Sequence, residues 1–317
     1  MPDVNRSRTP GKGPSQVLGI GIATLDIINQ VAQYPAEDAE VRADAQRLLR
    51  GGNCANTLAV LSALGHHCRW AGTLADDLGA TQIRADLSAR GIDFSGARVI
   101  QDGATPTSYI SLSRATGSRT IVHYRDLPEF TASDFARVDL TNLDWVHFEG
   151  RSPADTEAMI AQVAATRPGL PISVEIEKPR PEIERLFRLP NDRLTLIIVS
   201  RAFAEQQGAR EPEAFLHAFA RDCNARLLIL PWGAKGAYAL DRARQVRFAP
   251  ARPPARVIDT LAAGDVFNAA VIDALLQGAD LAEVLKRANS LAGRSCGQLG
   301  IDGLSTGPFL AQAISGD

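Results

Sequence analysis

Four short apolar segments in the second half of the chain are separated by amphipathic stretches. They cover residues 145–148, 172–176, 194–199 and 227–230. Apolar runs of this length are typical of buried parallel strands, and the stretches between them are long enough for crossover helices. This repetition predicts an α/β protein with a doubly wound, mostly parallel sheet and helices on both faces. In such a sheet, ligands bind beyond the carboxyl ends of the strands.

An apolar run at residues 17–23 suits a buried first strand, and Asp26 follows just after it. Gly19 and Gly21 within the run resemble the start of a dinucleotide-binding fingerprint, in which glycines let the backbone approach a pyrophosphate. However, no third glycine follows, and no helical pattern opens behind Thr24. The sequence therefore argues against a Rossmann-type cofactor site.

A second, smaller sheet is expected from the first half of the chain. Residues 108–113 and 118–124 alternate at period two around a turn that contains Gly117, a pattern typical of a β-hairpin. A hairpin that interrupts a βα series indicates a sheet apart from the main one. The segment at about 27–50, which reads as short strands and turns, is its expected companion. We therefore expect a β lid formed by about 27–50 and 105–125.

The rest of the pattern fits one domain. Residues 69–74 are predicted as a strand and residues 79–90 as a helix. The opening residues 1–16 contain Arg, Ser, Pro, Gly and Lys without an apolar run, which predicts a disordered tail. We expect residues 17–317 to form a single α/β domain.

Composition and charge argue against several functional classes. The formal net charge of -2 argues against nucleic acid as the principal partner. No stretch approaches the roughly 18 consecutive apolar residues of a membrane span. The four cysteines are far apart and the histidines form no His-Glu-x-x-His pattern, so neither disulfides nor a zinc site are indicated. We expect a cytoplasmic protein with no nucleic-acid or membrane partner.

A glycine turn at Gly51 and Gly52 leads into a helical pattern that closes at Gly65. Asn53 and Asn56 would project on one side of the first turn of that helix. They could cap the helix, or their amides could bind the hydroxyl groups of a polar ligand. The local sequence leaves both interpretations open.

A second helix start lies where Ala262, Ala263 and Gly264 precede Asp265 and a run of apolar residues at helical spacing. Small side chains let a ligand approach the backbone, and the N–H groups of a first helical turn form a site for anionic oxygen. A carboxylate at the same place could act as a base beside a phosphate that accumulates charge. Asp265 could also be a simple N-cap, because Asp is favoured there.

Other phosphate-binding and acyl-transfer motifs are missing from the sequence. It contains no Walker A loop, no protein-kinase His-Arg-Asp set and no Gly-x-Ser-x-Gly elbow. Phosphate chemistry would therefore need another cradle, such as the turn before Asp265.

Two separated motifs, at residues 51–56 and 259–265, resemble those of the ribokinase, or PfkB, family of carbohydrate kinases. The resemblance extends from about residue 17 to about residue 304. Within the family, the chain is most similar to the ketohexokinases (fructokinases), on strings such as Arg50-Gly51-Gly52-Asn53, Gly117-Ser118-Arg119-Thr120-Ile121, Glu149-Gly150-Arg151 and Glu175-x-Glu177-Lys178-Pro179-Arg180. The resemblance implies a ribokinase-like kinase domain over residues 17–317. It also implies ATP-dependent phosphorylation of a sugar hydroxyl, most closely that of D-fructose to fructose 1-phosphate.

The resemblance implies a role for each matching residue. Asp265 would be the general base that takes the proton from the attacking hydroxyl, and the N–H groups of Ala262, Ala263 and Gly264 would bind the transferring phosphoryl oxygens. The matching sugar-binding residues are Asp26, Gly52, Asn53 and Asn56.

The nucleotide and the partner subunit have their own matching residues. Arg119 would reach nucleotide phosphate from the lid, although a surface hairpin arginine is an equal reading. The segment Gly233, Ala234, Lys235, Gly236 resembles the family's nucleotide loop, although alone it is only a turn. Asp38 would reach the partner subunit's sugar in a homodimer clasped through the lids; otherwise it is a solvated charge.

The sequence departs from the family pattern in two places. Ala262 stands where the family usually has a glycine, so the turn must form without that glycine's freedom. The family's Asn-x-x-Glu motif, associated with magnesium, is not evident near residues 200–205, so no metal ligand is assigned. Mg2+ is still expected with ATP, and a monovalent cation such as K+ is a further candidate. A kinase of another sugar or nucleoside, or a non-catalytic sugar-sensing homologue, are the alternatives.

Overall fold

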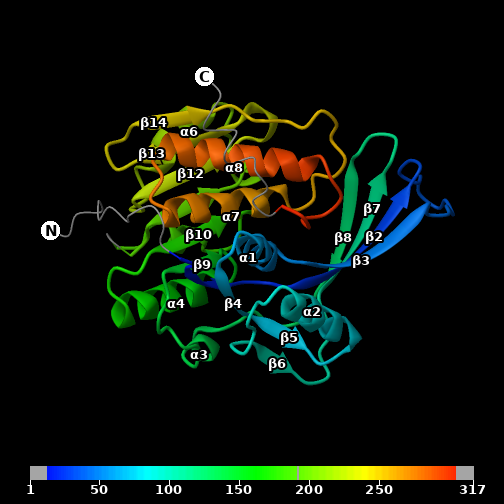
Figure 1. The fold of residues 1–317 in the computed structure, drawn as a ribbon, viewed down its shortest axis with the longest axis horizontal. Coiled ribbons are helices and arrows are strands. Elements are labelled where there is room, and N and C mark those ends of the chain that lie inside the picture. Colours follow the sequence, from blue (N-terminus) through cyan, green and yellow to red (C-terminus); the bar gives the residue numbers. More distant parts are fainter. Residues whose placement is uncertain (1–12, 191–192, 305–317) are drawn as a thin grey trace.

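The computed structural model describes residues 13–190 and 193–304, and its centre is a sheet of eight strands (Figure 1). The strand order is β14-β13-β12-β11-β10-β9-β1-β4. The six strands from β12 to β4 are parallel, whereas β13 and β14 add an antiparallel hairpin at one edge. The bounds are β1 (Gln16–Ile20), β4 (His67–Ala71), β9 (Trp145–Glu149), β10 (Ile172–Ile176), β11 (Leu196–Val199), β12 (Leu227–Pro231), β13 (Ala237–Asp241) and β14 (Val246–Ala249).

Helices cover both faces of this sheet, which confirms the doubly wound architecture. The helices are α1 (Asn53–Ala63), α2 (Leu78–Ala89), α3 (Ala132–Phe135), α4 (Pro153–Thr166), α5 (Arg201–Gln206), α6 (Pro212–Phe219), α7 (Ala263–Leu276) and α8 (Leu281–Cys296), with 3-10 turns η1 (Ile183–Leu186) and η2 (Gly233–Lys235). Successive strand residues point to opposite faces: Val17 belongs to the core cluster that contains residues of α1, α7 and α8, and Leu18 belongs to the cluster that contains residues of α3, α4, α5 and α6. This alternation explains why these strands carry apolar residues on both faces.

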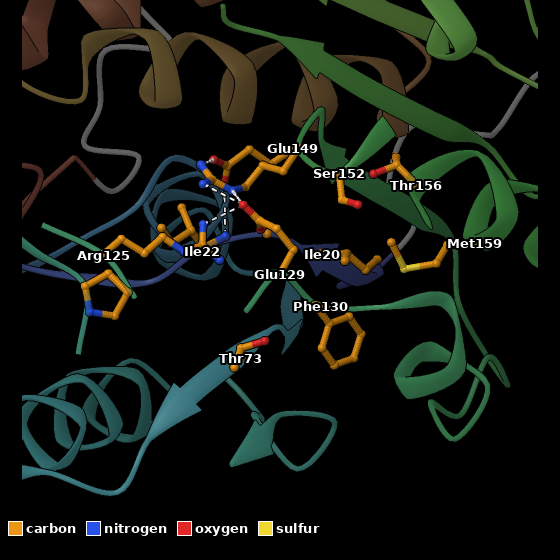
Figure 2. A pocket seen from close by; sticks show the side chains of 13 residues that line it. Ile20, Ile22, Thr73, Arg125, Glu129, Phe130, Glu149, Ser152, Thr156 and Met159 are labelled. Carbon is orange, nitrogen blue, oxygen red and sulfur yellow. Dashed lines mark hydrogen bonds and ion pairs between the residues drawn. The ribbon is translucent and has the colours of Figure 1, made fainter. Parts of the chain in front are cut away.

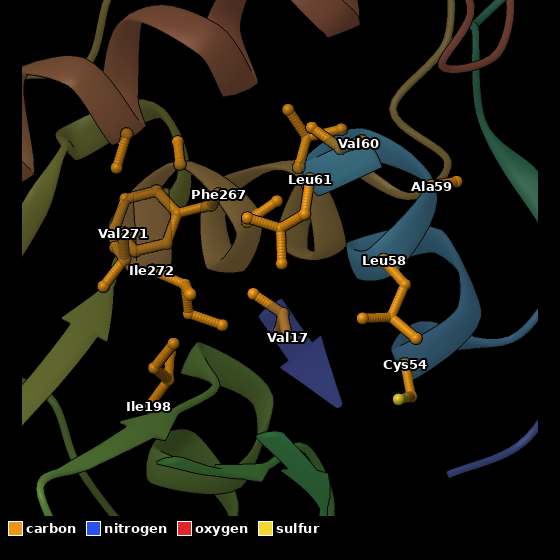
Figure 3. Packing of buried hydrophobic residues seen from close by; sticks show 14 of the residues in the cluster. Val17, Cys54, Leu58, Ala59, Val60, Leu61, Ile198, Phe267, Val271 and Ile272 are labelled. Atoms are coloured by element: carbon orange, nitrogen blue, oxygen red, sulfur yellow. The ribbon is translucent and has the colours of Figure 1, made fainter. Parts of the chain in front are cut away.

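The core on the α1 and α7 side brings together distant parts of the chain. Figure 3 shows Leu58 and Leu61 of α1 near Val17 of β1, with Phe267 and Val271 of α7 in the same layer. All five side chains are at most 3% exposed. The N-terminus of α1 and the N-terminus of α7 are therefore fixed relative to each other by apolar packing.

A separate four-stranded sheet has the order β3-β2-β7-β8. Its strands are β2 (Thr24–Val31), β3 (Ala45–Gly51), β7 (Thr107–Ser113) and β8 (Arg119–Tyr124), and it projects from one end of the large sheet (Figure 1). The predicted hairpin is β7 and β8, which pair antiparallel. The prediction of a small separate sheet is thus confirmed.

Two local predictions differ from the structure. The strand predicted at residues 69–74 is divided at Gly72 between β4 of the large sheet and β5 (Thr73–Ala75), which pairs with β6 (Arg98–Ile100). A Cβ at Gly72 would lie 2.3 Å from the carbonyl oxygen of Gly21, so close backbone approach directs the chain out of the sheet here. In addition, β1 begins at Gln16, inside the segment predicted as a tail; residues 1–12 of that segment lie outside the described residues.

Within the described ranges, no helix is long and apolar enough to cross a membrane.

Candidate active site

The turn before α7 determines where Asp265 lies. Helix α7 begins at Ala263, and its N-cap is Ala262, which adopts a left-handed conformation with φ 60° and ψ 7°. Asp265 is the third residue of the helix and lies three positions after the N-cap. The alternative that Asp265 is merely an N-cap is therefore wrong. The left-handed backbone at Ala262 turns the chain so that Ala263, Gly264 and Asp265 form the first helical turn, whose N–H groups have no intrahelical partner.

Asp265 points into the protein, towards α1. Its side-chain oxygen Oδ2 accepts a hydrogen bond of 2.8 Å from Nδ2 of Asn56, and its backbone oxygen accepts one of 3.3 Å from Oγ1 of Thr57. The residue is only 6% exposed. The predicted base and one predicted sugar-binding amide are therefore in direct contact.

Burial raises the pKa of Asp265 well above its ordinary value, and the charges of Glu175, Glu149 and Glu177 raise it further. The hydrogen bond from Asn56 acts in the opposite direction. The pKa of Glu175 is raised to about 8, chiefly by burial and next by the charge of Glu149. A carboxylate with a raised pKa is a stronger base once it is deprotonated, which suits proton abstraction.

Asn53 and Asn268 are held by the same carboxylate. Oε2 of Glu175, on β10, accepts from Nδ2 of Asn53 at 3.3 Å, and Oε1 accepts from Nδ2 of Asn268 at 2.9 Å. The amide nitrogen of Asn53 is thus directed inward, which leaves its Oδ1 as the acceptor for another group. The sequence analysis gave Glu175 and Asn268 no role; the signal for Glu175 was a carboxylate within a fully buried strand.

Arg50 is a third residue to which the sequence analysis gave no role. Its Nε donates to Oδ2 of Asp86 at 2.5 Å, and its NH1 donates to Oδ1 of Asn56 at 2.7 Å. Asn56 therefore accepts from Arg50 and donates to Asp265. No local pattern indicated this contact, because Asp86 lies on α2, far along the chain from β3.

Asp26 lies on β2, next to the glycine pair. Its Oδ1 accepts from Oγ1 of Thr24 at 2.9 Å. Burial raises the pKa of Asp26, which the hydrogen bonds from Thr24 and Ser108 oppose. A Cβ at Gly51 would lie 2.2 Å from Oδ2 of Asp26, so a glycine is required there for the carboxylate to keep its place.

Gly52 is required by backbone geometry. Its φ is 98°, and a Cβ there would lie 2.2 Å from the carbonyl oxygen of Ile22. Any other residue would be strained and would collide with the chain that leaves β1. Gly52 therefore lets α1 begin directly behind the end of the first strand.

The predicted nucleotide residues lie on two different elements. NH1 of Arg119, on β8, donates to Oγ1 of Thr260 at 2.5 Å, so the hairpin reaches the turn before α7. Gly233 and Gly236 bracket the short turn η2 after β12, which includes Ala234 and Lys235 and closes with a hydrogen bond of 2.7 Å from the N–H of Trp232 to Gly236.

Asp38 lies in the loop between β2 and β3. It is exposed and has a positive φ of 63°. The loop between β2 and β3 lies at the end of the small sheet that is far from α1 and α7 (Figure 1).

A neighbouring pocket lies on the other side of Glu149 (Figure 2). Its lining includes Ile22, Arg125, Glu129, Glu149 and Arg151. Oε2 of Glu149 accepts from the N–H of Ile22 at 2.9 Å. None of the five predicted sugar-binding and base residues, Asp26, Gly52, Asn53, Asn56 and Asp265, lines this pocket.

Comparison with known proteins places these residues in a family. The model of the pfkB family carbohydrate kinases matches residues 15–305. Mouse ketohexokinase is 39% identical over 297 residues, which cover 91% of this chain and 98% of that protein. An ATP-dependent ribose-1-phosphate kinase from Halopiger xanaduensis is 25% identical, over 95% of this chain and 98% of that protein.

The fold has solved counterparts. The structure of Arabidopsis thaliana ribokinase in complex with ribose and ATP superposes with a TM-score of 0.75 at 19% identity, over 96% of this chain and 100% of that chain. This similarity confirms the ribokinase-like α/β fold.

Proposed function

The chain belongs to the pfkB family of carbohydrate kinases, and we propose that it is a ketohexokinase-like enzyme that phosphorylates the C1 hydroxyl of D-fructose with ATP. The identity of 39% to mouse ketohexokinase over almost the whole chain supports this substrate. The similarity to a ribose-1-phosphate kinase and to a Bacillus subtilis ribokinase supports a kinase of another sugar or a nucleoside as the second candidate. The retained carboxylate at Asp265 argues against a non-catalytic sensor.

The contact between Asn56 and Asp265 is the observation that carries the proposed mechanism. Asp265 takes the proton from the sugar hydroxyl, the hydroxyl oxygen forms a bond to the γ-phosphorus of ATP, and the bond from that phosphorus to the β,γ-bridging oxygen breaks to release ADP. A positioned base of this kind contributes about a hundredfold to ten-thousandfold. Because Asp265 is buried, we expect substrate to enter when the small sheet, acting as the lid, moves away from the turn before α7.

The first turn of α7 supplies the charge stabilisation. The N–H groups of Ala262, Ala263 and Gly264 lie at the positive end of the helix, next to the base. Phosphoryl transfer depends mostly on positioning and on neutralising the oxygens of the moving group. One helix start can therefore serve both the base and the phosphoryl group.

The hydrogen bonds of the two asparagines predict what each offers to a sugar. Asn53 donates to Glu175 and therefore presents Oδ1, which accepts from a hydroxyl. Asn56 uses Oδ1 for Arg50 and one N–H for Asp265, so it presents its second N–H to a sugar oxygen. Asp26 accepts from further hydroxyls, and Gly52 lets the sugar approach the backbone. This arrangement fits a polyol.

We place ATP between the hairpin and the turn η2, with Arg119 on its phosphates and Gly233, Ala234, Lys235 and Gly236 beside the nucleotide. Among the described residues, no group of three or more His, Cys, Asp or Glu side chains converges as a metal cage. Mg2+ in kinases needs few protein ligands, because ATP phosphates and water supply most of its shell. Glu177, partly exposed beside Glu175, fits as the carboxylate that would hold it. Mg2+ would neutralise phosphate charge, and K+ would be a structural activator.

An apolar row crosses the outer face of the small sheet and supports a homodimer clasped through the lids. Leu48 pairs with Ile27, Ile27 with Tyr109, and Tyr109 with Val122, so one side chain from each strand lies in the row. Leu48 is 43% exposed, Tyr109 51% and Val122 66%. Exposed apolar rows of this kind mark interaction surfaces. In such a dimer, Asp38 would contact the partner subunit's sugar.

All four cysteines lie in the described part and are free thiols. Free thiols are usual in a reducing compartment, which supports placement of the enzyme in the cytoplasm.

The test is ADP release with ATP and a panel of fructose, tagatose, ribose, ribose 1-phosphate, adenosine and 2-keto-3-deoxygluconate. We expect the highest kcat/KM with fructose and a product phosphorylated on C1. A higher value with ribose, ribose 1-phosphate or adenosine would support the second candidate. Sugar binding by calorimetry without ATP binding or turnover would overturn both candidates in favour of a sensor.

A further inference from the structure

We propose that Arg50 is a positioning residue for the base, acting through Asn56, and that it connects the small sheet to the catalytic carboxylate. The proposal rests on the function proposed above for Asp265. It concerns a hydrogen-bonded chain of four side chains, Asp86, Arg50, Asn56 and Asp265, which come from α2, β3, α1 and α7.

The chain is buried along its centre. The side chain of Arg50 is 1% exposed, and both Asn56 and Asp265 are buried. A buried guanidinium is costly unless its donors are satisfied, and here one branch binds Asp86 while another binds Asn56. The position of Arg50 is therefore fixed at both ends rather than adjustable.

Arg50 decides which way the Asn56 amide faces. Because NH1 of Arg50 has only hydrogens to offer, it must meet the oxygen of the amide, at 2.7 Å. The nitrogen of the same amide is then the atom that faces Oδ2 of Asp265, at 2.8 Å. If the amide turned over, two oxygens would face each other across that distance. Arg50 thus keeps Asn56 as a donor to the base.

The shape of the guanidinium matters as well as its charge. Its planar fork holds Asp86 and Asn56 simultaneously from two nitrogens, which a lysine ammonium on a flexible stem does not reproduce. Asp86 also accepts from Arg90, whose Nε donates to both carboxylate oxygens at 3.0 and 3.1 Å. Arg90 binds the same acceptor as Arg50, the carboxylate of Asp86. It lies at the end of the hydrogen-bonded series opposite Asp265, so it provides a matched control.

Arg50 also connects the base to the small sheet. It is the penultimate residue of β3, and the next residue, Gly51, packs against the carboxylate of Asp26. Any movement of β3 therefore acts on Asn56 through Arg50 and on Asp26 through Gly51. The geometry of the base, Asp265, therefore depends on the position of the small sheet.

The charges around Asp265 set the direction of the expected pH effect. Burial and the charges of Glu175, Glu149 and Glu177 raise the pKa of Asp265, whereas the hydrogen bond from Asn56 lowers it. Loss of that donor leaves the raising influences unopposed, so the pKa of Asp265 rises further. A base must be deprotonated to act, so the acidic limb of the kcat profile should move to higher pH.

The experiment is the pH dependence of kcat for Arg50→Lys, with Arg90→Lys as the control. We expect kcat at neutral pH to fall about ten- to a hundredfold, the acidic limb to move to higher pH, and KM for ATP to change less than twofold. Arg90→Lys should keep the wild-type limb. An Arg50→Lys enzyme with an unmoved limb, or an Arg90→Lys enzyme with the same displacement, would overturn the proposal.

A double-mutant cycle separates positioning from general loss of structure. In an Asn56→Ala background, Arg50→Lys should lower kcat no further, because its route to the base has been removed. An additional loss as large as in the wild-type background would contradict the role of Asn56. Asp86→Asn, which weakens the far anchor of Arg50, should displace the limb in the same direction by a smaller amount; it is the second variant if Arg50→Lys fails to fold. Failure of the proposed function looks different, because the wild-type enzyme would then show no turnover.

Discussion

Asn56 and Asp265 stand 209 positions apart in the sequence, and a hydrogen bond of 2.8 Å joins their side chains in the interior of the protein. The bond crosses between α1 and α7, whose packing fixes the distance. It joins the proposed base to the amide that we propose binds the sugar.

Replacement of the base should remove turnover and keep binding. Asp265→Asn should lower kcat by about a hundredfold to ten-thousandfold, because the amide cannot accept the hydroxyl proton. Stopped assays of ADP release measure kcat, and calorimetry measures sugar binding. Asp273→Asn is the matched control: Asp273 is a buried carboxylate on the same helix that binds His66 at 3.0 Å, so its loss should affect stability and leave kcat near wild type. Full turnover by Asp265→Asn would mean that another group takes the proton.

The left-handed backbone at Ala262 predicts a stabilising substitution. Ala262→Gly removes the steric cost of a Cβ at φ 60°, about 1–2 kcal/mol, against a gain in unfolded-state entropy of about 0.4–1 kcal/mol. The free energy of unfolding should therefore rise by about 0.5–1 kcal/mol, as measured by urea denaturation. Ala263→Gly, one residue later in ordinary helical geometry, should lower it instead. A loss of stability in Ala262→Gly would show that the turn is not strained.

The raised pKa of Glu175, about 8 in the folded protein against 4.5 when exposed, predicts how stability depends on pH. Between these values the folded state holds a proton that the unfolded state releases, so stability is fully present below about pH 4.5 and falls as pH rises through 8. Glu175→Gln should flatten this fall when urea midpoints are compared from pH 6 to pH 9. Glu283→Gln removes a partly exposed carboxylate of α8 that pairs with Arg287 at 2.7 Å, and it should keep the wild-type slope. An equal slope in Glu175→Gln would contradict the assignment.

The packing of Gly51 against Asp26 predicts a defect in sugar binding. In Gly51→Ala the new methyl group would displace the Asp26 carboxylate, since the Cβ position lies 2.2 Å from its Oδ2. Loss of a charge-assisted hydrogen bond to the sugar should raise KM for the sugar about 10- to 100-fold, while KM for ATP serves as the internal control. An unchanged KM for the sugar would remove Asp26 from the binding site.

The apolar row on the small sheet predicts the effect of a charge at its edge. Val122→Asp should convert a dimer into a monomer, because a carboxylate cannot be buried in an apolar interface without a partner. Sedimentation velocity at micromolar concentration measures the change. Val99→Asp introduces the same charge at a residue of β6 that is 45% exposed, and should leave the association state unchanged. A monomeric wild-type protein would exclude the lid-mediated dimer at that concentration.

The sequence predicted the elements better than it predicted their contacts. Periodicity predicted the parallel sheet, the hairpin of β7 and β8 and the two helix starts, because these depend on neighbouring residues. It missed the break at Gly72, which results from a close approach to Gly21, and the left-handed turn at Ala262. Arg50 was missed as a site residue because its partners, Asp86 and Asn56, lie on two other elements.

The packing of α1 against α7 also has a consequence for the protein while it is being synthesised. A ribosome that adds about 5–20 residues per second completes α7 roughly 10–40 s after α1. During that interval Leu58 and Leu61 lack their packing partners Phe267 and Val271, which have not yet been synthesised. The nascent chain therefore exposes an apolar surface of α1 to chaperones during synthesis. A truncated chain that lacks α7 is therefore expected to aggregate and to be unable to use ATP.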